Sequence, residues 1–239
     1  MSGSSDLGKI IPWENPELQR RIGAIPFPSL VIVEGANDTG KSVLVQQATY
    51  GALKANFKVR YITTESTIIS FLNQMQSLSL NITQEFLVGK LKITPLHTDN
   101  FQWSPKTSKF LLKILSNHIE LNKESDVFVV DSLTHLIAYA EEKDILSFFS
   151  FIRNFVDKSK KTVIFTIHPY ALNQDLITRV RSICDGHLIL EIKNFGERIV
   201  RTVTASKLKG GEGGTPNFAT FEVEPAIGIK VIPFAQIKV

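Results

Sequence analysis

Short hydrophobic runs rich in β-branched residues alternate along the chain with longer segments in which apolar residues recur at helical spacing. The runs have the length of buried strands, and the segments between them are long enough for helices. Parallel strands are expected at Leu30–Glu34, Val59–Thr63, Leu91–Thr94, Val127–Asp131, Thr162–Ile167 and His187–Ile192. Strands that alternate with helices in this way predict βαβ units and a parallel sheet.

Two further stretches complete the expected fold. Residues 145–156 carry apolar side chains at i, i+3, i+4 and i+7, so they predict an amphipathic helix whose phenylalanines belong to the core. From Arg198 onward, apolar runs such as Phe218–Val223 and Ile227–Ile232 are separated by Gly or Pro without a helix between them. We therefore expect an α/β fold, with a mostly parallel central sheet flanked by helices and antiparallel C-terminal strands at one edge. A single domain over residues 1–239 is the simplest organisation.

Composition narrows the class of protein. Of 239 residues, 43% are hydrophobic, and the formal net charge of +4 is too small to argue for nucleic-acid binding. The apolar runs fall far short of the about 18 residues that a membrane-spanning helix needs. The first residues, Met1 to Asp6, lack the basic and apolar regions of a secretory signal, so we expect a cytoplasmic protein. A single cysteine, Cys184, excludes an intramolecular disulfide and is expected to be a small buried residue.

The strongest chemical signal is a phosphate-binding loop (P-loop). It follows a predicted strand, precedes a helical run that begins at Val43, and fits the pattern G-x-x-x-x-G-K-S/T. The expected nucleotide-binding residues are Gly35, Ala36, Asn37, Asp38, Thr39, Gly40, Lys41, Ser42 and Val43. Lys41 would reach the β- and γ-phosphates of ATP, and the Ser42 hydroxyl would bind Mg²⁺. Asp38 is unusual in a loop for anions and suits a turn better than a phosphate contact.

Asp131 is the expected second magnesium residue. It ends a hydrophobic strand at the edge where ligands bind in parallel sheets. The alternative is that Asp131 only caps the next helix. Ser132 follows it, where many ATPases of this class have a catalytic glutamate, so a water-activating base would have to come from elsewhere or be absent.

Four other residues are candidates for catalysis. Glu65 follows a strand end next to the P-loop and could hold a water in line with the γ-phosphate, although an acid at a helix start is an equal alternative. His168 follows a neighbouring strand and could sense the γ-phosphate, but an isolated histidine there need have no such role. Lys207 and Lys209 share one face of a late strand. They are either solvated protection of an edge strand or a pair that reaches the nucleotide of a neighbouring subunit.

Together these features resemble the KaiC-like branch of the RecA superfamily, and within it the FlaH (ArlH) family of the archaeal flagellum (archaellum) motor. The resemblance rests on the P-loop, Glu65, the stretch Thr166-Ile167-His168-Pro169, and Lys207-Leu208-Lys209-Gly210, and it extends over essentially the whole chain from Pro12 onward. It implies a RecA-like P-loop core that binds ATP and Mg²⁺ and forms a homo-hexamer, with Lys207 and Lys209 acting in trans. It also implies docking to the motor's secretion-type ATPase, beneath a membrane platform protein and, in some archaea, within a ring scaffold. The protein would then lie at the inner face of the membrane through the motor complex.

Two departures from the family pattern point to weak or absent ATP hydrolysis. Ser66 follows Glu65 where KaiC-like hydrolases usually carry a second acid, and Lys209 stands where a typical ring ATPase has arginine. The leading hypothesis is a regulatory ATP-binding module, and whether the chain is an enzyme stays open. The alternatives are an active ring ATPase that acts on DNA, which would need a concentrated basic surface, and a KaiC-like autokinase, which would normally use a duplicated core.

Overall fold

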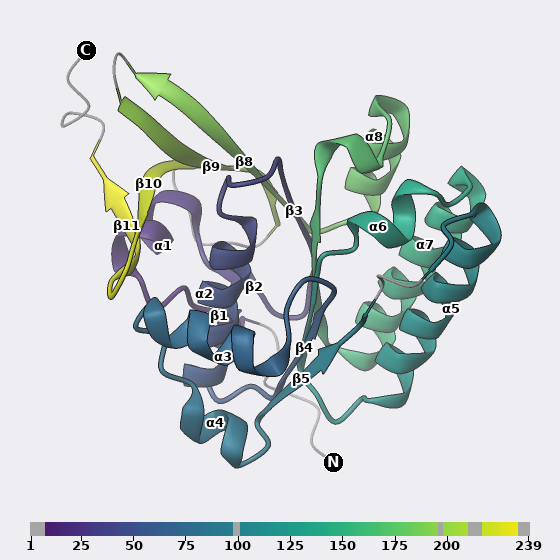
Figure 1. The fold of residues 1–239 in the computed structure, drawn as a ribbon, viewed down its shortest axis with the longest axis horizontal. Coiled ribbons are helices and arrows are strands. Elements are labelled where there is room, and N and C mark those ends of the chain that lie inside the picture. The colour runs from purple at the N-terminus through teal and green to yellow at the C-terminus, as the bar shows by residue number, and fades with distance from the viewer. Residues whose placement is uncertain (1–7, 98–100, 196–197, 210–216, 234–239) are drawn as a thin grey trace.

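The computed structural model describes residues 8–97, 101–195, 198–209 and 217–233. Its centre is a sheet that contains nine strands of the described chain, in the order β11-β10-β9-β8-β3-β7-β6-β4-β5 (Figure 1). The six strands from β8 to β5 in this order are parallel, and the pairs β8–β9, β9–β10 and β10–β11 are antiparallel. The expected mostly parallel sheet with an antiparallel C-terminal edge is therefore confirmed.

The strand positions agree closely with those expected from the sequence. The parallel strands are β3 (Leu30–Gly35), β4 (Val59–Thr63), β5 (Leu91–Pro95), β6 (Val127–Asp131), β7 (Thr162–Ile167) and β8 (Gly186–Phe195). The antiparallel strands are β9 (Arg198–Leu208), β10 (Phe218–Glu224) and β11 (Gly228–Ile232). The main difference is the length of β8, which continues to Phe195 because β9 pairs with it over its whole length. A small separate ladder joins β1 (Ile10–Ile11) and β2 (Ile25–Pro26).

Helices cover both faces of the sheet (Figure 1). One face carries α1 (Pro16–Ile22), α2 (Lys41–Lys54), α3 (Ile68–Ser77) and α4 (Thr83–Leu87). The other carries α5 (Pro105–Leu121), α6 (Thr134–Ala138), α7 (Glu142–Ser159), the short 3₁₀-helix η1 (Pro169–Ala171) and α8 (Gln174–Ile183). The amphipathic helix expected at residues 145–156 is the middle of α7, and its apolar positions are buried as predicted. None of the described helices is long and apolar enough to cross a membrane.

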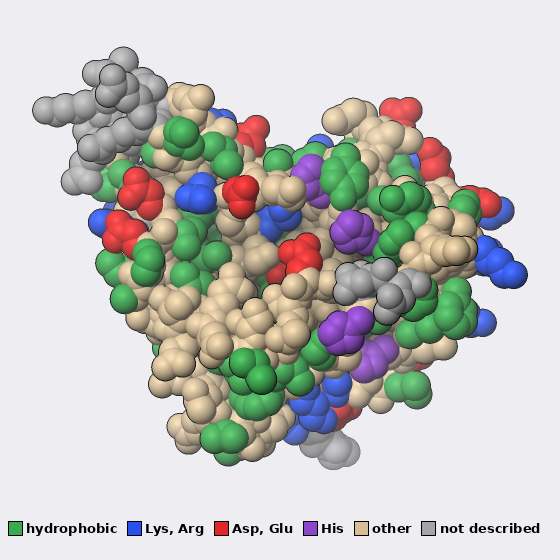
Figure 2. Space-filling view, viewed as in Figure 1, with side chains coloured by type: hydrophobic (Ala, Val, Ile, Leu, Met, Phe, Trp, Pro, Cys, Tyr) green, Lys and Arg blue, Asp and Glu red, His purple; other side chains and the backbone are tan. Residues whose placement is uncertain are grey.

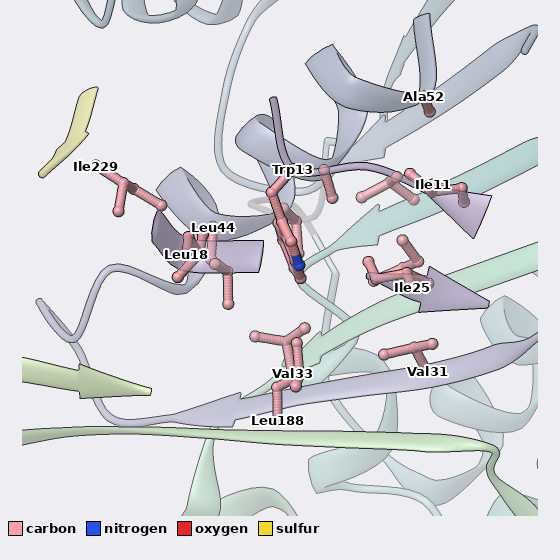
Figure 3. Packing of buried hydrophobic residues seen from close by; sticks show 14 of the residues in the cluster. Ile11, Trp13, Leu18, Ile25, Val31, Val33, Leu44, Ala52, Leu188 and Ile229 are labelled. Carbon is pink, nitrogen blue, oxygen red and sulfur yellow. The ribbon is translucent and has the colours of Figure 1, made fainter. Parts of the chain in front are cut away.

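The two layers of helices give two hydrophobic clusters, one on each face of the sheet. In the first, the Trp13 side chain points from the N-terminal segment toward the sheet (Figure 3). The Trp13 indole donates to Gly23 O at 2.6 Å, and Gln47 of α2 donates to Trp13 O at 2.6 Å. The Gln47 contact fastens α2, which begins at the P-loop, to the N-terminal segment. Cys184 lies in the second cluster and is fully buried, as expected.

The register brings the C-terminal ends of several parallel strands together at one end of the sheet. Thr63, the last residue of β4, is paired with Asp131, the last residue of β6. The strand β7 lies between β6 and β3, so the ends of four neighbouring strands meet beside the P-loop. The starts of the same strands lie at the opposite end of the sheet. This separation of the two ends of the sheet decides which of the expected site residues can lie close to the P-loop.

Candidate nucleotide-binding site

The P-loop turns tightly between β3 and α2. Gly40 has a φ of 91°, in the left-handed region that glycine tolerates, and Asp38 also lies in that region with a φ of 61°. A Cβ atom on Gly35 would lie 2.6 Å from Thr39 Oγ1 and 2.9 Å from Leu190 O, so only glycine fits there. Thr39 Oγ1 donates to Ala36 O at 2.8 Å and closes the turn. The loop therefore leads into the N-terminus of α2, the geometry that suits a bound phosphate.

Lys41 is the first residue of α2, and its ammonium lies within the loop. Lys41 Nζ donates to Ala36 O at 2.7 Å. Burial lowers the pKa of Lys41, while the nearby carboxylates of Asp131, Glu65 and Asp38 act in the opposite direction. Lys41 thus lies at the meeting point of the loop and the carboxylates of the site.

Asp131 is held by hydroxyl groups from three elements. Thr166 of β7 donates to Asp131 Oδ1 at 2.6 Å, and Ser42 of α2 donates to the same oxygen at 3.3 Å. Tyr61 of β4 donates to Asp131 Oδ2 at 2.7 Å. Asp131 does not cap the next helix, because the N-cap position of α6 is Leu133 and that end has no side-chain cap. The structure thus brings together Ser42 and Asp131, the two residues expected to hold magnesium.

Among the described residues, no cluster of three or more His, Cys, Asp or Glu side chains could hold a metal ion. Magnesium typically binds one or two carboxylates, keeps several waters and takes further oxygens from phosphates. The hydroxyl and carboxylate oxygens of Ser42 and Asp131 are ligands of the kind that Mg²⁺ prefers.

Glu65 and Lys41 line one cavity, which is described below. The backbone N–H of Glu65 donates to Thr63 Oγ1 at 3.2 Å, and Glu65 precedes the N-cap of α3, Thr67, by two positions. Glu65 is therefore outside the first turn of α3. Burial, followed by the negative charge of Asp131, raises the pKa of the Glu65 carboxyl group.

His168 and Tyr170 form another wall of the cavity. His168 is the N-cap of η1, and its ring lies 4.2 Å from that of Tyr170, measured between centroids. The backbone N–H of His168 donates to Thr134 Oγ1 at 3.0 Å, which connects this wall to the segment after Asp131. Burial, and then the charge of Lys41, lowers the pKa of His168.

The cavity that these residues enclose measures about 740 Å³, a size typical of sites for small ligands and cofactors. Its lining includes Asn37, Asp38, Gly40, Lys41, Ser42, Val43, Glu65, Asp131 and His168 of the expected set. Sequence reasoning missed His135, Tyr170, Arg201 and Val223, which also line it. Arg201 Nε donates to Asp38 O at 2.8 Å, so β9 contacts the P-loop. A motif search could not find Arg201, because only the hairpin of β8 and β9 brings it to the loop.

Lys207 and Lys209 lie at the end of the sheet where the parallel strands start, which is opposite to the end that carries this cavity. Lys207 is paired with His187 near the start of β8, and the backbone N–H of Lys209 donates to Asp185 O at 3.0 Å. The Lys207 ammonium donates to Arg181 O at 2.8 Å, at the end of α8, and burial lowers its pKa. Lys209 is exposed, and its side chain makes no hydrogen bond or ion pair with the described part of the chain. The two side chains therefore do not project freely as a pair.

Comparison with known proteins identifies the family. The model of a family described as "ATPase: KaiC" matches residues 11–236. The archaeal flagellar ATP-binding protein FlaH of Sulfolobus acidocaldarius is 37% identical over 226 residues, which cover 95% of this chain and 98% of the relative. The FlaH protein of Methanocaldococcus jannaschii is 34% identical and covers 92% of this chain and 94% of its own length. The chain belongs to the FlaH family of KaiC-like proteins.

Solved structures agree with this assignment. The crystal structure of the flagellar accessory protein FlaH from M. jannaschii matches with a TM-score of 0.80 and 31% identity, over 94% of this chain and 98% of that chain. A KaiC-like protein from Pyrococcus horikoshii, with a TM-score of 0.73 and 20% identity, shows the same fold. The expected RecA-like and KaiC-like fold of this FlaH-family chain is thus confirmed.

Proposed function

We propose that this FlaH-family chain binds ATP with Mg²⁺ and acts as a regulatory component of the archaellum motor. The observation that carries the proposal is the meeting of the P-loop with Asp131, where Ser42 Oγ lies 3.3 Å from Asp131 Oδ1 beside Lys41. The names of the relatives, archaeal flagellar ATP-binding proteins, support ATP binding and the link to the archaellum. In this proposal residues 1–239 form one ATP-binding domain.

The P-loop and the residues around Asp131 have distinct roles in this proposal. The backbone N–H groups between Gly35 and Val43 donate to the phosphates, and Lys41 leaves Ala36 O to contact the β- and γ-phosphates. Ser42 and Asp131 hold Mg²⁺, while Thr166 and Tyr61 keep the Asp131 carboxylate in place.

The proposed role of ATP is regulatory rather than motor-driving. Ser132 and Ser66 stand where hydrolases of this class often have acids, and Ser132 donates its backbone N–H to Thr64 Oγ1 at 3.0 Å. Glu65 is left as the candidate base, with His168 beside it in the cavity. A general base typically contributes about 10²–10⁴-fold to a rate. Glu65 has no second acid at position 66 or 132, which favours slow or absent hydrolysis.

The position of Lys209 supports assembly of several copies. The strand β3 runs from the end of the sheet near Lys209 to the P-loop. It extends for about 17 Å at a rise of ~3.3 Å per residue. Lys209 therefore cannot reach the nucleotide of its own chain, and a role at a nucleotide requires a second copy. We propose that ATP favours a homo-hexameric ring in which Lys209, and Lys207 after release from α8, face the neighbouring γ-phosphate. The nucleotide state would then control docking to the motor's secretion-type ATPase, beneath the membrane platform and within the ring scaffold, at the inner face of the membrane.

Calorimetric titration with ATP and Mg²⁺ tests the proposal. A charge-assisted contact contributes roughly 1.5–3 kcal/mol, so Lys41→Ala should weaken ATP binding by about ten- to hundred-fold while the chain stays folded. Phosphate release measured in parallel should be slow. An affinity within about two-fold of wild type would refute the assignment of Lys41, and turnover faster than about one per second would favour an active ATPase.

A further inference from the structure

A second, smaller pocket adjoins the nucleotide cavity between α2 and α3. It measures about 160 Å³ and shares Ser42, Glu65 and Asp131 with that cavity. Gln46 of α2 and Gln74 of α3 also line it, and we call it the α2–α3 pocket. Acidic, basic and histidine side chains line the larger cavity, and Figure 2 shows side chains of these kinds together below the notch at the top of the molecule. The α2–α3 pocket thus borders the two residues proposed to hold magnesium.

Gln46 follows Ser42 by one turn of α2. Residues four positions apart share a face of a helix, so the two side chains are neighbours. Gln46 is 2% exposed, and its Nε2 donates to Gln74 Oε1 at 2.8 Å. Its Oε1 is buried and accepts no hydrogen bond from the residues that the structure describes. A buried acceptor without a donor is costly, and such atoms in folded proteins commonly bond to water in an adjoining pocket.

The polar groups of the pocket define what can fill it. The hydroxyl groups of Ser42 and Tyr61 both donate to Asp131, at 3.3 Å and 2.7 Å, so they are already engaged. Ionised Asp131 and Glu65 contribute only acceptor oxygens. Gln46 Oε1 is a further acceptor. A molecule that contacts these three side chains therefore has to donate hydrogen bonds.

Water held by Mg²⁺ has this character, because its oxygen is turned toward the ion and both hydrogens are free to donate. Mg²⁺ usually keeps several waters when one or two protein side chains and the phosphates of a nucleotide bind it. Ser42 and Asp131, the proposed protein ligands, line both the nucleotide cavity and the α2–α3 pocket. The pocket is also large enough, since one water needs roughly 15 Å³.

We propose that Gln46 is a positioning residue for magnesium, and that its Oε1 accepts a hydrogen bond from a water that the ion keeps. The inference rests on the proposed function, because it requires Mg²⁺ at Ser42 and Asp131. The bond from Gln46 Nε2 to Gln74 orients the amide and leaves the acceptor end for the water. Loss of such an outer hydrogen bond typically reduces metal affinity by about ten- to hundred-fold.

The test measures ATP affinity by calorimetry with Mg²⁺ and in EDTA. The dissociation constant in EDTA divided by that in Mg²⁺, the magnesium ratio, reports what the metal contributes. Gln46→Met removes the acceptor but keeps the length of the side chain and a high helix propensity. The magnesium ratio should fall about ten-fold, with the affinity in EDTA within about two-fold of wild type. A structural role alone would weaken binding equally under both conditions, and that result would overturn the proposal.

Three further variants separate the acceptor from the packing around it. Gln74→Met is the matched control, because it breaks the same Gln46–Gln74 hydrogen bond but leaves Gln46 Oε1 in place, so it should keep the wild-type magnesium ratio. Gln46→Glu keeps an acceptor oxygen and should also preserve the ratio. Gln46→Leu repeats the removal of the acceptor with a second apolar side chain and should lower the ratio as Gln46→Met does. A ratio that fell equally in Gln74→Met or in Gln46→Glu would contradict the proposal.

The wild type separates this proposal from the proposed function. A wild type that binds ATP equally well with Mg²⁺ and in EDTA would refute the metal role of Ser42 and Asp131, and the role of Gln46 with it. A large wild-type magnesium ratio that Gln46→Met and Gln46→Leu leave unchanged would refute the role of Gln46 alone and leave the binding of ATP and Mg²⁺ standing.

Discussion

Replacing Tyr61 with phenylalanine removes a single oxygen from the centre of the site. Tyr61 is fully buried, and its hydroxyl donates to Asp131 Oδ2 at 2.7 Å. Burial, followed by the neighbouring charge of Asp131, raises the pKa of Tyr61 well above its usual value, so this hydroxyl stays a donor. Phenylalanine fills the same space, and its ring keeps the contact with Phe71, whose centroid lies 4.4 Å away.

The magnitude follows from the partners of Asp131. Thr166 and Ser42 both donate to Oδ1, and Tyr61 is the donor found for Oδ2 among the described residues. Tyr61→Phe therefore leaves a buried carboxylate oxygen without a donor, and a hydrogen bond to a charged group contributes about 1.5–3 kcal/mol. Urea denaturation without nucleotide should show a free energy of unfolding lower by that amount. Mg²⁺ near Asp131 would offset part of the charge, so the loss should be smaller with ATP and Mg²⁺.

Two comparisons make the result specific. In an Asp131→Asn background the hydrogen bond would join neutral groups, so the additional loss from Tyr61→Phe should fall to about 0.5–1.5 kcal/mol. Tyr50→Phe is the control, because Tyr50 lies on the same side of the sheet but its ring contacts the Lys54 ammonium at 5.1 Å. The reasoning is wrong if Tyr61→Phe and Tyr50→Phe unfold alike, or if the loss is the same with aspartate and with asparagine at position 131.

Three further predictions concern single charges. Asp131→Asn should weaken ATP binding with Mg²⁺ present but not in EDTA, and calorimetry under both conditions would contradict a magnesium role if the losses were equal. The raised pKa of Glu65 means that the folded state binds protons more readily than the unfolded chain, so stability falls as pH rises from about 4.5 through the raised pKa. Glu65→Gln should thus be more stable than wild type above that window and equal to it below, with ATP affinity little changed, as thermal melts and titrations across pH would reveal. Lys209→Ala should impair ATP-dependent assembly without changing the melting temperature. Lys207→Ala should lower the melting temperature, because Lys207 also contacts the end of α8. Identical behaviour of the two variants in light scattering and in melting would assign both lysines one role.

Much of the architecture could be predicted because the local signals agree with one another. In β6 the apolar run and the terminal aspartate mark both the strand and the strand end, and the regular spacing of Ile145, Phe148 and Ile152 marks the buried face of α7. The P-loop is also local, since its glycines, its lysine and the following helix lie within one short stretch. Such features depend on neighbours in the sequence and can be recognised without a structure.

The rest of the site depends on pairings between distant segments. Tyr61 and Thr166 reach Asp131 only because β4 and β7 flank β6, and Arg201 reaches the P-loop only because β9 folds back along β8. The position of Lys207 depends on the register irregularity between His187 and Leu188, which a spacing of two residues cannot reveal. These contacts follow from strand order and register, which the sequence pattern leaves open.

The strand directions also limit how copies of this chain can associate through the nucleotide. The P-loop follows the end of β3, and Lys209 lies beside Asp185, whose carboxylate accepts the backbone N–H of Leu30 at the start of the same strand. In a head-to-tail contact that places Lys209 over a neighbouring nucleotide, the surface with Lys209 on one copy meets the surface with the P-loop on the next. An open row of copies then has an unused P-loop surface at one end and an unused Lys209 surface at the other. Such a head-to-tail contact forms a ring if its rotation closes and a filament if it does not. A two-fold dimer would instead have to place two antiparallel copies side by side, so that each Lys209 reaches the other copy's nucleotide in one closed contact. Light scattering that stopped at a dimer would therefore argue against the head-to-tail arrangement.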